Sequence, residues 1–299
     1  MIRRILLASA GAIALSGAAF AADLHVPPPR PPPPYVPLPW TGFYVGLNAG
    51  YEWSNNVSVN SSGTPLYFDP VADPTEVFET ALTGVGTANL PVKNNGFIGG
   101  GQIGYNFQFA NNTVASAEAD IEGIAGSTST ATRATFTPIL GTPGSYTTAV
   151  GVSNKLDYFG TLRGRYGYLF TPTLLVYGTG GFAWGGTSTS VGFVSSDTFG
   201  DPTVFGSSRL STTSVGWTAG GGLEWMFAPN WTAKVEYLYY ELSKQTSSFG
   251  YLTQNFPAGT FGGSAALTHF TIQPKGSIVR VGVNYLFNWG APPAVVAKY

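Results

Sequence analysis

The sequence of 299 residues contains no cysteine, two histidines and few charged residues. Without cysteine the chain can form neither disulfide bonds nor metal sites built on thiolates. Charged residues make up 10% of the chain and the formal net charge is −1, so it lacks the basic face that nucleic-acid binding requires. No long apolar run follows residue 21. Because a membrane-spanning helix needs about 20 such residues, we expect no transmembrane helix.

Glycine and aromatic residues are abundant instead, with 40 glycines and 14% aromatics. Few charges, many aromatics and no apolar run of helical length together favour a β-barrel in a membrane. In such a barrel only every second residue of a strand meets lipid, so no continuous apolar stretch is needed.

Residues 1–21 have the organisation of a secretory signal peptide. Arg3 and Arg4 form a basic start, residues 5–15 are apolar, and Ala19 and Ala21 supply the small residues before a cleavage site. The alternative is a membrane anchor, but the apolar stretch is too short for a hydrocarbon core of about 30 Å. We therefore expect export by a cleaved signal peptide.

Residues 22–39 form a proline-rich segment, with nine prolines between positions 26 and 39. Proline fixes φ and removes a backbone donor, so this segment is expected to be extended polyproline II. One interpretation is a semi-rigid periplasmic spacer. The other is a docking peptide for a periplasmic partner.

Eight segments between residues 40 and 287 alternate apolar and polar residues with a period of two. One of them places Val235 and Tyr237 on one face and Lys234 and Glu236 on the other. Another is expected to place Leu156 with the apolar face. The fold expected over 40–287 is all-β: an eight-stranded antiparallel up-and-down transmembrane β-barrel with long extracellular loops. Residues 288–299 remain as a C-terminal tail.

Eleven charged residues of these strand cores all have the parity of the polar face. They are Glu52, Glu118, Asp120, Glu122, Asp157, Arg163, Arg165, Glu224, Lys234, Glu236 and Arg280. Three acids precede two arginines on neighbouring strands, where antiparallel pairing can join them. We expect a structural charge network in the barrel interior. The alternative for these residues is a polar permeation path.

The connections between the segments alternate in length. Tight turns are predicted at 111–112, 171–173 and 229–230, and long connections rich in Ser, Thr and Gly at 55–95, 128–154, 188–212 and 243–275. Short periplasmic turns and long extracellular loops are typical of bacterial outer-membrane barrels. Both termini are then periplasmic. Aromatic residues near the strand ends, Trp40 among them, are expected in the two interfacial girdles.

Six segments together resemble the small outer-membrane barrels of alphaproteobacteria, often called porin-family or outer-membrane immunogenic proteins. They are residues 41–46, 162–168, 177–184, 220–224, 235–239 and 282–287. The resemblance implies an abundant surface barrel of the Gram-negative outer membrane, linked to envelope integrity, with outer-membrane lipid and lipopolysaccharide around it. Some members are described as porins or haemin binders.

The C-terminus departs from the pattern of such barrels, which commonly end on an aromatic residue recognised by the barrel-assembly machinery. Phe287 would serve here, but twelve residues follow it. The signal is therefore either internal, or Tyr299 takes its place.

Four classes of function follow from these observations. The leading one is a structural surface barrel with roles in envelope integrity and surface interaction, because the interior of an eight-stranded barrel is just wide enough for its own side chains. The second is a porin for small solutes. The third is binding of haemin or a host surface through the loops, where His269 is the histidine available as an axial ligand. The fourth is an enzyme, which would need a nucleophile, a base and an orienting group. No nucleophile motif lies beside His25 or His269, so we expect no catalysis, cofactor or metal.

Overall fold

The computed structural model describes residues 40–54, 57–67, 88–126, 128–138, 143–198, 204–248, 252–253 and 265–287. These residues form strands and the turns between them. No helix in these ranges is long and apolar enough to cross a membrane. The expected signal peptide (1–21), spacer (22–39) and tail (288–299) lie outside the described residues.

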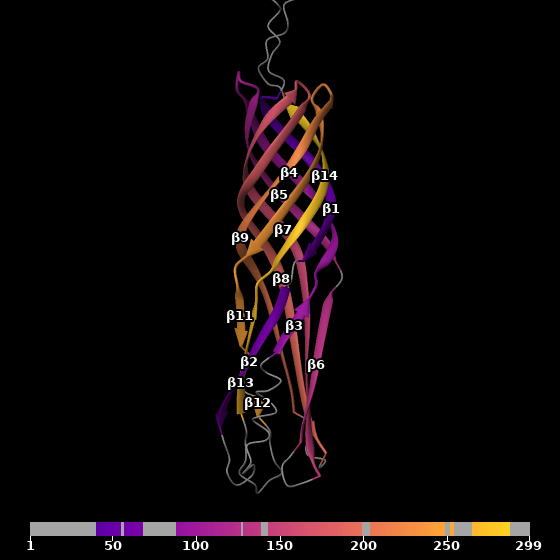
Figure 1. The fold of residues 1–299 in the computed structure, drawn as a ribbon, viewed down its shortest axis with the longest axis vertical. Coiled ribbons are helices and arrows are strands. Elements are labelled where there is room, and N and C mark those ends of the chain that lie inside the picture. The colour runs from indigo at the N-terminus through magenta and orange to yellow at the C-terminus, as the bar shows by residue number, and fades with distance from the viewer. Residues whose placement is uncertain are drawn as a thin grey trace, which may run out of the picture. The chain divides into compact units, whose positions relative to one another are not determined.

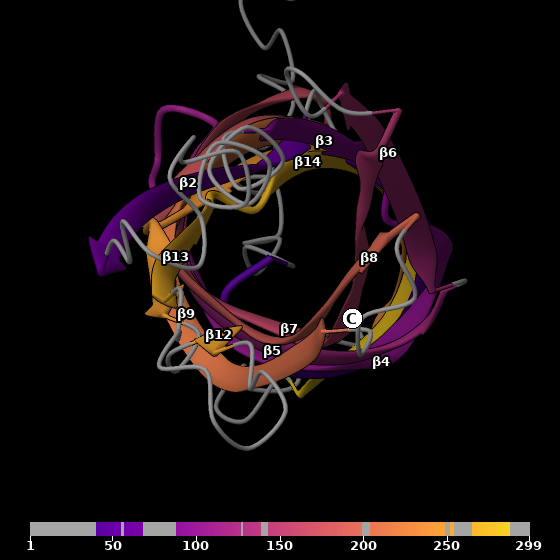
Figure 2. The same cartoon turned by 90° about the horizontal axis from the view of Figure 1, so that it is seen from below.

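Eight antiparallel strands close into a ring (Figures 1 and 2). They are β1 (Gly42–Ser54), β4 (Asn95–Gln108), β5 (Thr113–Gly126), β7 (Ser145–Thr171), β8 (Leu174–Asp197), β9 (Val204–Ala228), β10 (Trp231–Leu242) and β14 (Lys275–Phe287). Each strand pairs with those before and after it in this order, and β14 pairs with β1 to close the ring. The predicted eight-stranded up-and-down barrel is therefore confirmed.

Three short connections lie at one end of the barrel, which we call the turn end. They join β4 to β5, β7 to β8 and β9 to β10, at the three predicted positions. Asn112 and Asn230 adopt left-handed φ values of 62° and 69°, which asparagine tolerates better than most residues. The Asn230 side-chain amide donates to the Leu286 carbonyl at 2.6 Å, which ties this turn to the end of β14.

Strands β7, β8 and β9 continue far beyond the barrel, with 27, 24 and 25 residues against 12 in β10. The strand β6 (Ser129–Pro138) pairs with the continuation of β7. A second sheet has the order β11 (Gln245–Ser248), β13 (Ala265–Ile272), β2 (Val57–Tyr67) and β3 (Ala88–Val92), with β12 (Leu252–Thr253) paired to β13. We call this part, in the lower half of Figure 1, the extension. The described portions of the four predicted loops thus contain strands.

The extension has an apolar core of its own, which explains why these Ser- and Thr-rich segments form strands. Its buried residues come from both sheets: Val57, Val59, Leu90, Val92, Val150, Val152, Val191, Phe193, Phe270 and Ile272. They alternate along each strand with glycine, proline or small hydroxyl residues. Burial of one face stabilises a strand at roughly 25 cal/mol per Å² of apolar surface, and the hydroxyl residues of the other face remain in water.

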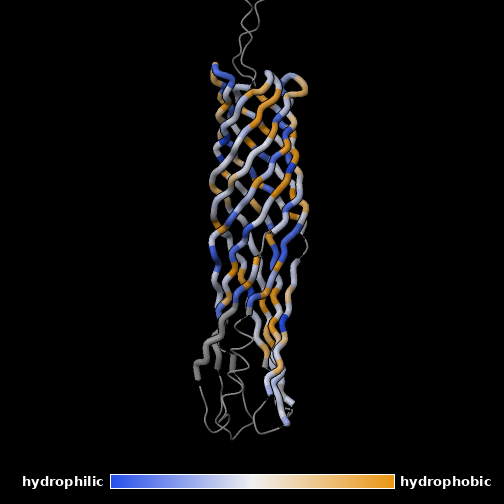
Figure 3. Tube along the Cα trace, in the orientation of Figure 1, coloured by the Kyte–Doolittle hydropathy of each residue, from blue (hydrophilic) through white to orange (hydrophobic). Residues whose placement is uncertain are grey.

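Large apolar side chains cover the outside of the barrel. Figure 3 shows the hydropathy of the residues along these strands. Leu47 is 74% exposed and Val281 is 55% exposed, although both lie in the middle of strands. The residues that alternate with these apolar ones along each strand face the interior, as the predicted parity requires. Asn48 and Arg280, for example, are buried. An apolar outer belt on a closed barrel is the arrangement that a lipid bilayer stabilises.

Two placements differ from the sequence prediction. A β-bulge between Leu156 and Tyr158 reverses the parity of β7, so Leu156 points inward and is buried. Asp157 is the extra residue of the bulge, as two residues on one strand oppose one on the other. Trp40 is fully buried in the turn-end mouth and is not part of a girdle. Its indole N–H donates to the Pro172 carbonyl at 2.9 Å, and its backbone N–H donates to Gln108 at 3.2 Å.

Candidate functional site

The barrel interior gathers nine of the eleven predicted charges into one layer, which we call the charge layer. Its members are Glu118, Asp120, Glu122, Arg163, Arg165, Glu224, Lys234, Glu236 and Arg280, each at most 4% exposed. They come from β5, β7, β9, β10 and β14. Charges taken out of water require close partners of opposite sign, and the contacts below supply them.

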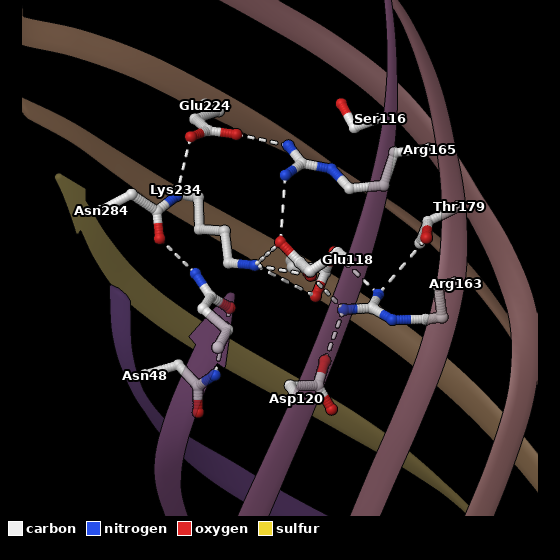
Figure 4. Close-up of polar contacts among 12 residues, drawn as sticks. Asn48, Ser116, Glu118, Asp120, Arg163, Arg165, Thr179, Glu224, Lys234 and Asn284 are labelled. Carbon is white, nitrogen blue, oxygen red and sulfur yellow. Dashed lines mark hydrogen bonds and ion pairs between the residues drawn. The ribbon is translucent and has the colours of Figure 1, made fainter. Parts of the chain in front are cut away.

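Arg163 links several acids of the charge layer (Figure 4). It is the direct cross-strand neighbour of Glu118 in the β5–β7 pairing, and the two side chains form an ion pair. The same guanidinium contacts Asp120 at 2.8 Å. Its other terminal nitrogen reaches Glu236 of β10 at 3.0 Å. One arginine thus joins acids from strands on two sides of the ring.

Arg280 makes a second crossing of the interior. Its Nε donates to Glu236 at 2.7 Å, and Nη2 donates to Asp120 at 2.9 Å. Nη1 also pairs with Glu122. Because β1 and β4 separate β14 from β5 in the ring, these contacts span the barrel and do not follow a single strand pairing.

Arg165 and Lys234 complete the layer toward the turn end. Both contact Glu118, at 3.1 Å, and Arg165 also pairs with Glu224. The Arg165 guanidinium lies 3.9 Å from the centre of the Tyr177 ring, a cation–π geometry. Four cations therefore face five acids in a space without bulk solvent.

Neutral side chains satisfy further acceptors of the layer. The Tyr44 hydroxyl donates to Glu118 at 2.7 Å, and Thr232 donates to Glu224 at 2.6 Å. A Cβ atom at Gly104 would lie 2.4 Å from the Tyr44 ring, so this glycine makes room for the ring inside the barrel. The interior is filled by side chains that the inward parity predicted, which agrees with the small radius of eight strands.

The other two predicted charges lie apart from the layer. Glu52 is fully buried and accepts a hydrogen bond from Tyr240 at 2.6 Å, and no ion pair with it occurs among the described residues. Asp157 pairs with Lys155 at 3.0 Å, and the two side chains are 39% and 41% exposed. The prediction that Asp157 faces the interior was wrong, because the bulge turns it to the outer surface of the extension.

Apolar side chains close the barrel on both sides of the charge layer, a feature that the sequence reasoning missed. On the turn side lie Trp40, Val114, Leu169, Leu175 and Tyr177. On the extension side lie Ile98, Ile124, Leu156, Phe159, Ala183, Leu238, Tyr240, Leu242 and Ile278. The signal was present in the sequence, since Leu175, Leu238 and Ile278 are apolar residues at inward positions.

The candidate ligand residue His269 lies on β13 of the extension. Its Nδ1 is 3.1 Å from the Ser248 hydroxyl. Within the described ranges, no group of three or more His, Cys, Asp and Glu has the arrangement of a metal site.

Comparison with known proteins agrees with this architecture. The chain matches the family described as outer membrane protein beta-barrel domain over residues 7–287. It is 35% identical over 246 residues to the 31 kDa outer-membrane immunogenic protein of Brucella melitensis, which covers 82% of this chain and 89% of that protein.

Two further relatives are more distant or shorter matches. The 25 kDa outer-membrane immunogenic protein of Brucella melitensis is 25% identical over 268 residues, covering 86% of this chain and 96% of that protein. The 22 kDa outer membrane protein of Rhizobium leguminosarum is 37% identical over 119 residues, covering 38% and 49%. The names of these relatives describe outer-membrane proteins, two of them immunogenic. The chain therefore belongs to the outer membrane protein β-barrel family and is an outer-membrane protein of a Gram-negative bacterium.

Proposed function

We propose that this protein is a closed structural barrel of the outer membrane that holds its extension outside the cell as an interaction surface. The observation that carries the proposal is the filling of the interior. An ion-paired layer lies between two apolar layers, and together they occupy the barrel from the turn end to the extension. Eight strands leave little room beyond these side chains.

The small-solute porin is the competing function, and the apolar layers argue against it. A hydrated ion crossing the barrel would have to displace Trp40 at one end and the contacting rings of Phe159 and Tyr240 at the other. It would also have to cross charges that are already paired with one another. Wide aqueous channels occur in barrels of roughly sixteen or more strands.

Planar-bilayer recording of the refolded, full-length protein tests the closed interior. The expected result is no stable conductance of general-porin size at single-molecule dilution, with a sixteen-stranded porin as positive control in the same bilayer. Large, steady steps from the monomer would refute the proposal.

The outward direction of the extension is tested separately by cysteine labelling. Because the chain has no cysteine, a maleimide can react only with the thiol that is introduced. Val194→Cys places a thiol on the extension, where Val194 is exposed, and Thr171→Cys places one at the turn end. A membrane-impermeant maleimide should label the first variant on intact cells and the second only after the outer membrane is permeabilised. The reverse pattern would show that the extension faces the periplasm.

A further inference from the structure

The outward face of the extension carries a groove of about 420 Å³ across β6, β7, β8 and β9. Two glycines form its floor: Gly151 and Gly192 are direct partners in the β7–β8 pairing. They are flanked in the same row by Thr132 of β6 and Ser207 of β9. A Cβ added at Gly192 would meet no atom within 4 Å, so the space above this residue is open. The missing side chains therefore create the groove.

Hydroxyl groups and one cation line the barrel side of this groove. The next row across the four strands is Thr130, Ser153, Ser190 and Arg209, as the strand registers show. All four line the groove. Among the described residues no acid lies within ion-pair distance of Arg209; Asp157, which is paired with Lys155, interacts with it electrostatically from further away. The row presents several hydroxyl groups and one positive charge to a ligand.

The row of residues just outside the opposite edge of the groove is apolar. Beyond the glycine pair, the next row contains Ala134, Ala149, Val194 and Phe205. Phe205 is 81% exposed and Val194 is 42% exposed. A flat hollow with hydroxyl groups and a guanidinium on one side and apolar groups on the other matches a sugar ring that bears an anionic group. Hydroxyls can pair with hydroxyls, the ring can lie over the glycines, and the arginine can bind an oxyanion.

The position of the groove selects one source of such a ligand. It faces sideways, on the same outer surface as the lipid-facing belt, and not toward the tip of the extension. Ser153 lies five positions before Tyr158, an outward aromatic at the barrel edge, which is roughly 16 Å of strand. If the extension points outward, the groove then stands at the height of the sugars attached to the lipids of the outer leaflet.

We propose that this groove binds the phosphorylated core saccharide of the lipopolysaccharide that surrounds the barrel. A phosphate group pairs with Arg209, and an adjacent sugar ring lies over Gly151 and Gly192. The proposal rests on the outward direction of the extension given above. It adds a specific contact by which a closed barrel is joined to the lipid layer around it.

The test uses lipid-free core oligosaccharide that retains its phosphates, titrated calorimetrically into the folded, full-length protein in detergent. This probe removes acyl-chain contacts with the barrel. Gly192→Leu fills the open space above the groove floor, and Arg209→Gln removes the charge. Each should weaken binding about tenfold or more. Arg209→Gln removes a charge-assisted hydrogen bond, which contributes on this scale. Gly192→Leu places a side chain where the sugar ring would lie. Treatment of the probe with phosphatase should weaken wild-type binding and leave Arg209→Gln little changed.

Two matched variants control for nonspecific effects. Ser243→Leu and Lys244→Gln make the same kinds of change at exposed positions between β10 and β11, away from the groove. They should bind as the wild type does. The proposal is overturned if the wild type does not bind the probe, if all four variants bind alike, or if phosphatase treatment has no effect. Binding in solution together with periplasmic labelling of Val194→Cys would exclude outer-leaflet lipopolysaccharide as the source.

Discussion

The barrel and the extension share strands β7, β8 and β9, but among the described residues only the barrel buries charged side chains. Inside the barrel lies the charge layer, and outside it are large apolar side chains such as Val281. Inside the extension lie valines such as Val152 and Val191, and outside it are serines such as Ser153 and Ser190. The outer face of one continuous sheet thus carries large apolar residues around the barrel and serines around the extension.

Strand β8 makes this change without any change of parity. Its inward positions run from Tyr177 and Thr179 in the barrel to Val191 in the extension core. Its outward positions run from the exposed Phe182 to Ser190. The difference teaches that a period of two identifies the two faces of a strand, whereas the surrounding solvent decides which face is apolar. Lipid selects an apolar outer face and water selects an apolar inner one.

The largest expected effect comes from the barrel interior. Arg280→Met removes a cation that contacts Asp120, Glu122 and Glu236. Asp120 and Glu236 keep their contacts with Arg163, but Glu122 is left without an ion pair among the described residues. Removing one partner of a buried ion pair costs about 3–5 kcal/mol. Urea unfolding in lipid vesicles measures the loss. The matched variant Lys155→Met breaks a half-exposed pair on the extension and should cost at most about 1 kcal/mol. Equal losses in the two variants would contradict the distinction between the two regions.

A double-mutant cycle on two contacting residues tests whether the buried charges of the barrel interact. Arg163 and Asp120 lie 2.8 Å apart within the charge layer. The effects of Arg163→Met and Asp120→Asn should be non-additive by about 0.5–3 kcal/mol. Additive effects in the same unfolding assay would mean that the two side chains do not interact in the folded barrel.

Substitution by arginine should destabilise the protein on the outer face of the barrel but have little effect on the outer face of the extension. Val281→Arg places a charge on the lipid-facing belt and should cost about 2–4 kcal/mol near the bilayer midplane. Ser190→Arg places it on the outer face of the extension, in water, where the expected change is within about 0.5 kcal/mol. Both are measured by urea unfolding in vesicles. A similar cost at the two positions would show that the extension also contacts lipid, or that the belt does not.

A smaller loss than at Val281 is expected in the core of the extension. Val152→Thr keeps the shape of the side chain but buries a hydroxyl among valines, at a cost of about 1–3 kcal/mol. Its neighbour Ser153 faces outward, so Ser153→Thr serves as the control and should be neutral. Hydrogen exchange of the extension amides reports the local loss. Unchanged exchange in Val152→Thr would mean that the core admits water.

The barrel was predictable from sequence because its pattern has one simple cause. Each strand alternates between lipid and interior, so the faces of residues such as Lys234 and Val235 follow directly from parity. The bulge at Asp157 was not predictable, since one extra residue in a strand leaves no mark in composition and reverses every assignment on one side of it. The extension was missed for a different reason. Its strands alternate small valines with serines and threonines, which also suits an irregular surface connection.

The positions of Trp40 and of the apolar layers could not be predicted from the pattern of charged residues. An aromatic residue at the start of a strand suits either an interfacial girdle or a buried mouth, and only the hydrogen bond to the Pro172 carbonyl distinguishes them. The charge layer itself was recognisable from parity. Its partners were not, because contacts such as that between Arg280 and Asp120 cross the interior between strands that are not neighbours.

The placement of Arg280 has a consequence for the order in which the barrel assembles. It lies on β14, the last strand of the ring to be synthesised, yet its acidic partners include Asp120 and Glu122 on β5, the third. Before β14 pairs with β1, Asp120 can still pair with Arg163 of the neighbouring strand β7, whereas Glu122 has no other cation among the described residues. Joining the last seam and supplying Glu122 with its cation are therefore a single event. Burial of Glu122 without that cation is penalised, which favours all-or-none closure over a long-lived open intermediate.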